Sequence, residues 1–164
     1  MHDTKTAENL MAAFAGESQA NRKYLAYAKK AEAEGKDNIA KLFRATADAE
    51  TIHAFKEFEL AGMVNSTEEN LRDAVDGETY EYKEMYPEFM EVAQSEGNKA
   101  AVTTFSYALQ AEEVHAKLFQ EALDSPEESG EQFYYLCPVC GNIERAVPER
   151  CIICGVPGSK FIKY

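Results

Sequence analysis

Two Glu-x-x-His pairs, Glu50–His53 and Glu112–His115, use two of the three histidines in this 164-residue chain. On an α-helix, residues three positions apart lie on the same face, about 5–6 Å apart at their Cβ atoms. Each pair can therefore direct a carboxylate and an imidazole at one point. Groups that converge in this way are suited to binding a metal ion. The two pairs therefore indicate a metal site.

The sequence around the two pairs is repeated as well. When residues 35–57 are aligned with residues 97–119, four further identities are found, which are Gly35/Gly97, Phe43/Phe105, Ala49/Ala111 and Ala54/Ala116. This repeat predicts a two-helix unit that is used twice. Two such units would face each other across a helical bundle.

Four long segments have the apolar periodicity of amphipathic helices, at about residues 5–34, 37–60, 78–95 and 99–123. Gly35 and Gly97 favour short turns within each pair of helices, Asp37 is expected to cap the second helix, and Pro87 is expected to kink the third. Residues 63–77 predict a crossover with a short helix. One long connection and two short turns favour a four-helix bundle with a single crossover.

Carboxylates interrupt the apolar stripes of these helices at Glu17, Glu50 and Glu112. Glutamates are rarely buried unless they are paired or bound to a metal. Glu17 precedes Glu50 by nearly the same number of residues as Glu78 precedes Glu112. Antiparallel neighbours would therefore bring each of these pairs to one level of the bundle.

The candidate ligands of this site are Glu17, Glu50, His53, Glu78, Glu81, Glu112 and His115. One Glu from each of two helices and a Glu-x-x-His from each of the other two is the pattern of dinuclear iron and manganese bundles, with Glu81 as an additional carboxylate. Carboxylates with few imidazoles suit iron or manganese. A single Glu-x-x-His usually belongs to a solvated helix face, but two copies in register favour a dinuclear site.

All four cysteines lie near the C-terminus, as Cys137-x-x-Cys140 and Cys151-x-x-Cys154. Four thiolates at this spacing predict a tetrahedral metal site, with a structural zinc and a single iron as open alternatives. We expect residues 1–126 to form the helical bundle and the polar residues 127–132 to form a linker. Residues 133–164 are expected to form a small β-rich domain around the cysteines.

Composition narrows the classes of partner. The net charge of −12 argues against binding to nucleic acid or to an anionic membrane surface. No apolar run approaches the roughly 18 residues of a membrane span. The first residues lack a basic region followed by an apolar one, so we expect no signal peptide and a cytoplasmic location.

With both sites on one chain, the sequence resembles rubrerythrin, a family that joins a ferritin-like di-iron bundle to a C-terminal rubredoxin-like domain. The motifs that carry the resemblance are Gly16-Glu17-Ser18, Glu50-Thr51-Ile52-His53, Gly77-Glu78-Thr79-Tyr80-Glu81, Glu84-Met85-Tyr86-Pro87, Glu112-Glu113-Val114-His115 and both cysteine knuckles. They cover nearly the whole chain, and no ligand position is altered.

The resemblance implies a peroxidase in which two ferrous ions reduce hydrogen peroxide to water. One iron is expected to take Glu17, Glu50 and either Glu81 or His53, which would exchange as the site changes redox state. The other iron would take Glu78, Glu112 and His115, with Glu50 and Glu112 as bridges. Tyr24 and Tyr86 match tyrosines that hydrogen-bond the ligand carboxylates in the family.

The resemblance further implies one iron at Cys137, Cys140, Cys151 and Cys154, for which zinc can substitute. That iron would receive electrons from a donor protein of the rubredoxin or reductase type, with an indirect link to NAD(P)H. A head-to-tail homodimer is also implied. The alternative is a ferroxidase or iron-handling protein of the ferritin-like class, although storage would not require the thiolate centre. A metal-binding interaction module without enzymatic activity would leave the buried carboxylates unexplained.

Overall fold

The computed structural model describes residues 4–125 and 130–164, which form two compact units. The first unit ends at Asn65 and the second begins at Ser66. No helix in the described residues is both long and apolar enough to cross a lipid bilayer. Each unit is built on long helices that match the four helical segments predicted from the sequence.

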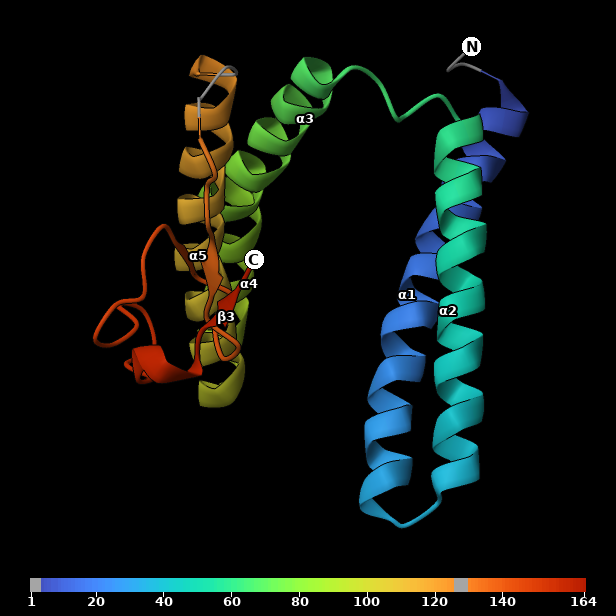
Figure 1. The fold of residues 1–164 in the computed structure, drawn as a ribbon, viewed down its shortest axis with the longest axis horizontal. Helices are drawn as coiled ribbons and strands as arrows, with labels where there is room; N and C mark the ends of the chain where they lie inside the picture. Colours follow the sequence, from blue (N-terminus) through green and yellow to red (C-terminus); the bar gives the residue numbers. More distant parts are fainter. Residues whose placement is uncertain (1–3, 126–129) are drawn as a thin grey trace. The chain divides into compact units, whose positions relative to one another are not determined.

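The first unit is an antiparallel pair of helices, α1 (Lys5–Ala33) and α2 (Asp37–Leu60), which lie side by side in Figure 1. Small side chains let the two backbones approach closely, and the buried residues of the pair are Ala7, Ala28, Ala31, Ala40, Ala47 and Ala54. The stacked rings of Phe14 and Phe58, with centroids 4.5 Å apart, close one end of this interface.

The turn between α1 and α2 corrects one expectation. Gly35 adopts a positive φ of 71°, and the backbone N–H of Lys36 donates to the carbonyl of Ala31 at 2.8 Å. This closed turn makes Lys36 the N-cap of α2. Asp37, predicted to be the cap, instead lies in the first turn, where its carboxylate still faces the positive end of the helix dipole.

In the second unit, the first helical segment consists of α3 (Thr67–Tyr80), the π-helix η1 (Glu81–Met85) and α4 (Tyr86–Ser95). The sequence predicted that this segment begins at Glu78, and that boundary is wrong. The hydroxyl of Ser66 accepts from the N–H of Glu69, and the Glu69 carboxylate accepts from the N–H of Ser66. This capping box starts the helix at Thr67, so the predicted crossover helix is continuous with it.

Pro87 lies in the first turn of α4, directly after the π-helical turn. Proline has no N–H to donate and its ring crowds the preceding turn, so the regular hydrogen-bond ladder cannot continue through it. The disturbance predicted at Pro87 takes the form of a wider helical turn. Such single π-helical turns are frequent at functional sites.

The segment α3–η1–α4 packs against α5 (Lys99–Asp124), whose N-cap is Asn98. A three-stranded antiparallel sheet follows, with strands β1 (Tyr135–Leu136), β2 (Ile143–Glu144) and β3 (Ile162–Lys163) in the order β2-β1-β3. The 3₁₀-helix η2 (Gly158–Lys160) precedes β3, and β2 contacts α5. Residues 126–129, which include part of the predicted linker 127–132, lie outside the described residues.

Candidate metal centres

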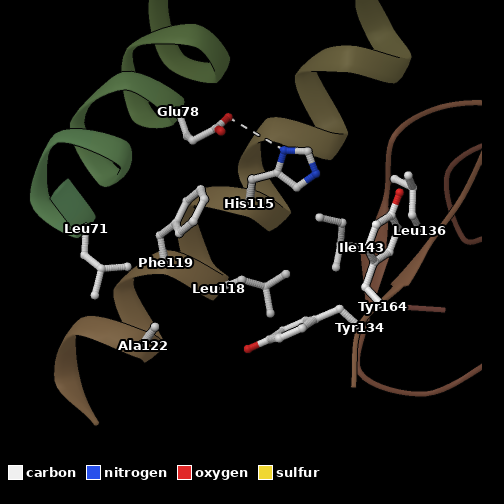
Figure 2. A pocket seen from close by; sticks show the side chains of 10 residues that line it. All are labelled: Leu71, Glu78, His115, Leu118, Phe119, Ala122, Tyr134, Leu136, Ile143 and Tyr164. Carbon is white, nitrogen blue, oxygen red and sulfur yellow. Dashed lines mark ion pairs between the residues drawn. The ribbon is translucent and has the colours of Figure 1, made fainter. Parts of the chain in front are cut away.

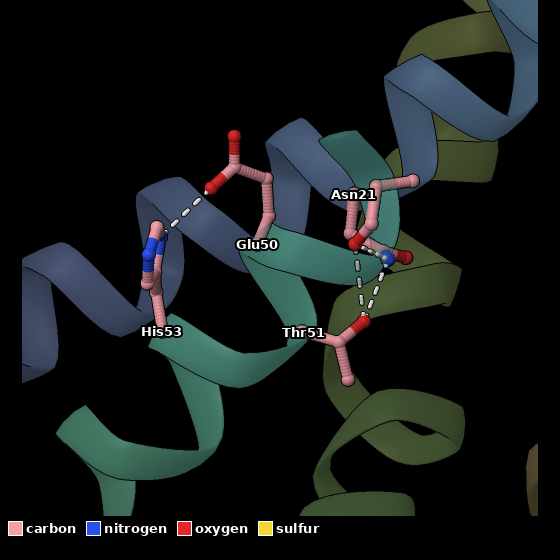
Figure 3. Close-up of polar contacts among 5 residues, drawn as sticks. Asn21, Glu50, Thr51 and His53 are labelled. Carbon is pink, nitrogen blue, oxygen red and sulfur yellow. Dashed lines mark hydrogen bonds and ion pairs between the residues drawn. The ribbon is translucent and has the colours of Figure 1, made fainter. Parts of the chain in front are cut away.

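The first triad of candidate ligands lies in the first unit. It consists of Glu17 on α1 with Glu50 and His53 on α2, and their ligand atoms all lie within 4.8 Å of one another. Nδ1 of His53 lies 2.9 Å from Oε2 of Glu50, as Figure 3 shows. The side chain of Glu50 is 15% exposed, whereas that of His53 is 56% exposed. The predicted convergence of these three residues is therefore present, with the imidazole at the surface of its unit.

Asn21 fixes the level at which α1 and α2 meet. Its Nδ2 donates to the carbonyl oxygen of Ala47 at 2.7 Å and to Oγ1 of Thr51 at 2.9 Å (Figure 3). Asn21 follows Glu17 by one helical turn, and Thr51 follows Glu50 directly. The two hydrogen bonds therefore hold the Glu17 carboxylate opposite the Glu50 carboxylate. The sequence offered a signal for this role, because Asn21 is a polar residue in the apolar stripe of its helix.

Glu57 is a second residue that the ligand prediction missed. Its Oε2 is buried and has no hydrogen-bond partner among the described residues. Partial burial and the neighbouring carboxylates of Glu50 and Glu57 raise the pKa of Glu17. An orphaned carboxylate oxygen beside this triad indicates that the site is built to receive a cation. In the sequence repeat, Glu57 corresponds to Phe119.

The second triad lies in the second unit and consists of Glu78 on α3 with Glu112 and His115 on α5. Nδ1 of His115 lies 2.6 Å from Oε2 of Glu112 and 3.7 Å from Oε2 of Glu78. Figure 2 shows the Glu78 carboxylate turned toward the imidazole of His115. All three side chains are less than a quarter exposed. This triad is therefore more enclosed than the first.

The pKa values of the second triad are shifted because its two carboxylates lie close together and are partly buried. Burial and the Glu112 carboxylate raise the pKa of Glu78 to about 7. Burial opposes the charge on Glu112, but the hydrogen bond from His115 holds the pKa of Glu112 below its ordinary value. Burial likewise opposes the charge on His115, and the bond to Glu112 raises the pKa of His115. A bound cation would relieve this repulsion, so the donor set fits a metal ion.

The carbonyl oxygen of Gly141 lies 2.9 Å from Nε2 of His115. A carbonyl can only accept, so Nε2 carries the proton. Nδ1 donates to the Glu112 carboxylate in the metal-free protein. Once that proton is lost, the Nδ1 lone pair would point at the carboxylates, which is the orientation that a metal-ligating imidazole requires. Gly141 directly follows Cys140, so this bond also joins the triad to a cysteine knuckle. It was not predicted, because the two residues are far apart in sequence.

Glu81, Tyr86 and Tyr24 lie outside the two triads. Glu81 is the first residue of the π-helix, and burial together with the Glu112 carboxylate raises its pKa. Burial and the carboxylates of Glu112, Glu81 and Glu78 raise the pKa of Tyr86. The ring of Tyr24 packs near Phe43, with centroids 6.1 Å apart. Neither tyrosine hydroxyl bonds a carboxylate among the described residues, so these roles remain predictions.

The third centre is formed by Cys137, Cys140, Cys151 and Cys154, whose sulfur atoms all lie within 4.8 Å of one another. The Sγ–Sγ distances are 3.5 Å for Cys137–Cys154 and for Cys140–Cys151. Tetrahedral bonds of about 2.3 Å to one metal ion give sulfur–sulfur edges of about 3.8 Å. Burial opposes the Cys151 thiolate, but backbone N–H groups of Cys154 and Ile153 lower the pKa of Cys151 to about 7. The cluster therefore fits one four-coordinate metal ion.

A largely apolar cavity of about 570 Å³ lies beside the second triad (Figure 2). Glu78 and His115 form its polar part, and Phe119, Leu136 and Ile143 are among its apolar lining residues. The cavity lies between α3, α5 and the small sheet. It gives a small solute access to the two ligand side chains.

The chain is similar to proteins of known family over nearly its whole length. Residues 8–123 match the family model described as Rubrerythrin. Rubrerythrin-2 of Clostridium acetobutylicum is 42% identical, with 95% of each protein covered. Nigerythrin of Nitratidesulfovibrio vulgaris is 40% identical, with 99% of this chain and 90% of that protein covered.

Solved structures of nigerythrin match the chain as well. The mixed-valence state has a TM-score of 0.60 at 40% identity, and the match covers 100% of this chain and 91% of that chain. The fully reduced, all-ferrous state has a TM-score of 0.61 at 39% identity, with 99% and 90% covered. These matches confirm the predicted fold class, a ferritin-like arrangement of four long helices with a small β-rich C-terminal region.

Proposed function

We propose, since this chain belongs to the rubrerythrin family of non-haem iron oxidoreductases, that it is a peroxidase that reduces hydrogen peroxide to water. The chain carries the Glu/His di-iron ligand set and the four-cysteine cluster of that family. When bound, two ferrous ions would supply the two electrons that, with two protons, convert one peroxide molecule into two water molecules.

The ligands of the two irons follow from the motifs. Glu17, Glu50 and either Glu81 or His53 would hold one iron, and Glu78, Glu112 and His115 would hold the other. Glu50 and Glu112 would bridge the two. The enclosed triad supports this assignment, because the Gly141 carbonyl already orients His115 for metal binding. Tyr24 and Tyr86 would hydrogen-bond the ligand carboxylates.

The observation that carries the electron relay is the hydrogen bond between His115 and Gly141. Through it, a ligand side chain of the di-iron centre contacts the backbone of the residue after Cys140. An electron held at the four cysteines would therefore cross to the triad through one covalent segment and one hydrogen bond. The cavity beside Glu78 and His115 supports the same function, because it leaves these ligands accessible to a small solute such as peroxide.

The electron donor, the cellular location and the dimer are also part of the proposal, and they are those that the family resemblance implies. A redox protein of the rubredoxin or reductase type would supply the electrons, ultimately from NAD(P)H. The chain would work in the cytoplasm as a head-to-tail homodimer. The predicted division into a bundle (1–126), a linker (127–132) and a rubredoxin-like domain (133–164) would separate the peroxide chemistry from electron entry.

Cys140→Ser tests the relay in the iron-loaded full-length protein. We expect this variant to lose peroxide reduction that is driven by a donor protein. Oxidation of a chemically pre-reduced di-iron centre by peroxide should remain near the parent rate. Equal loss in both assays would show that the cysteine region is needed for folding and not for transfer. A parent protein that consumes ferrous iron and oxygen, but no peroxide, would instead support the ferroxidase alternative.

A further inference from the structure

Asn142 is fully buried beside the four-cysteine cluster, with 0% of its surface exposed. Within residues 4–125 and 130–164 it is the only polar residue apart from cysteine that is buried to this degree. Its Nδ2 donates to Oε1 of Glu144 at 2.8 Å and lies 3.8 Å from Sγ of Cys151. Its Oδ1 is buried and has no hydrogen-bond partner among the described residues.

The orientation of this amide follows from its neighbours. Nδ2 lies between a carboxylate oxygen and a cysteine sulfur, which are both acceptors. Rotating the amide by half a turn would place Oδ1 against these two acceptors, which is unfavourable. The amide therefore presents its donor side to Cys151.

The backbone of the knuckle does not require an amide at this position. The two knuckles share the same backbone hydrogen bond. In the first, the N–H of Cys137 donates to the carbonyl of Asn142 at 2.8 Å. In the second, the N–H of Cys151 donates to the carbonyl of Val156, also at 2.8 Å. The glycines at the two turns have similar positive φ angles, 84° at Gly141 and 74° at Gly155.

Valine therefore occupies in the second knuckle the place that Asn142 occupies in the first. An apolar residue is compatible with the turn, and it would not bury an unsatisfied oxygen. A buried polar atom without a partner destabilises the fold, whereas an apolar replacement of similar shape does not. The amide must consequently serve something other than the turn. It places a side-chain donor beside Sγ of Cys151, and Val156 offers no such donor in the second knuckle.

We propose that Asn142 raises the reduction potential of the four-cysteine iron centre by donating a hydrogen bond from its side-chain amide to Sγ of Cys151. Uptake of one electron adds a negative charge that is spread over the four sulfurs, and no bond is made or broken. Hydrogen bonds to the sulfurs stabilise this more negative state. The backbone N–H of Asn142 already bonds Cys140, so one residue acts on two of the four sulfurs.

This inference rests on the proposed function, because it requires iron at the cysteines. It goes beyond that function by assigning the potential to a residue that is not a ligand. Asn142 is a positioning and tuning residue, and it takes no part in peroxide chemistry.

The test is a redox titration of the iron-loaded full-length protein, followed by visible absorption of the sulfur-to-iron bands. We expect Asn142→Leu, which removes the donor and keeps the approximate shape, to retain its iron and to shift the midpoint potential downward. Asn142→Val, which copies the second knuckle, should shift it in the same direction. The matched control is Val156→Leu, which alters the equivalent position without removing a donor and should leave the potential unchanged.

Glu144→Gln separates the two contacts of the amide. This variant keeps an acceptor for Nδ2 and removes a negative charge near the iron, so the potential should stay the same or rise. The inference is wrong if Asn142→Leu and Asn142→Val both titrate at the parent potential, or if Glu144→Gln lowers the potential as much as they do. A parent protein whose cysteines take up zinc only, or show no reversible reduction, would overturn the proposed relay as well.

Discussion

The two Glu-x-x-His triads come from one repeated motif, yet their surroundings differ. His115 is 17% exposed and is held on both sides, by Glu112 at Nδ1 and by the Gly141 carbonyl at Nε2. His53 is 56% exposed, and among the described residues its ring contacts Glu50 at Nδ1. The repeat therefore supplies the same candidate ligands, but the ring of His115 is held at both nitrogens and the ring of His53 is held at Nδ1.

This difference has a consequence for metal binding. An imidazole whose second nitrogen is bonded has a fixed tautomer and ring orientation, so less freedom is lost when it takes up a metal. An exposed imidazole can leave a metal at little cost. The exposure of each histidine within its own unit agrees with the proposal that His53, rather than His115, exchanges with Glu81 as a ligand.

The largest expected effect is a difference between His115→Ala and His53→Ala. We expect His115→Ala to weaken iron binding by roughly 100-fold or more, because it removes an oriented ligand and leaves Glu78 and Glu112 in close repulsion. His53→Ala should retain most of its iron in the oxidised state, because Glu81 can replace the imidazole there. Iron content per chain of the two oxidised variants, each a matched control for the other, measures this difference. Equal losses of iron would remove the distinction between fixed and exchangeable histidines.

The sequence predicted the convergence of each Glu-x-x-His pair, because helical spacing places the two side chains on one face regardless of what surrounds them. It missed the continuation of α3 back to Thr67, because a capping box was read as part of a separate crossover helix. The bond between His115 and Gly141 could not be predicted, since it depends on how the small sheet packs against α5.

The second expected effect concerns the pH dependence of the metal-free protein. The pKa of Glu78 is raised from its ordinary value of 4.5 to about 7, so the folded state binds this proton more tightly than the unfolded state. Stability should therefore be highest near pH 5 and fall as the pH rises through about 7, by about 1–2 kcal/mol after solvent screening is taken into account. The raised pKa values of Glu81 and His115 act in the same direction.

Chemical denaturation from pH 5 to pH 8 in the presence of a chelator measures this loss. Glu78→Gln, which cannot ionise, should flatten most of the profile. Glu112 acts in the opposite direction, because its lowered pKa contributes stability that is lost only as the pH falls below about 4.5. A parent profile that rises between pH 5 and pH 8 would contradict the repulsion that we assign to the second triad.

The smallest expected effect is at Glu57, a carboxylate that corresponds to Phe119 in the other repeat. Because Oε2 of Glu57 is buried and has no partner in residues 4–125 and 130–164, Glu57→Leu should stabilise the metal-free protein by about 1 kcal/mol, measured by denaturation with a chelator present. Glu59→Leu on the same helix is the matched control, since Glu59 is exposed and should change stability little. When iron is added, the advantage of Glu57→Leu should disappear, because the buried carboxylate then lies near a cation. A variant that is less stable than the parent without metal would show that Glu57 supports the fold itself, and the orphaned oxygen would no longer count as a sign of a cation site.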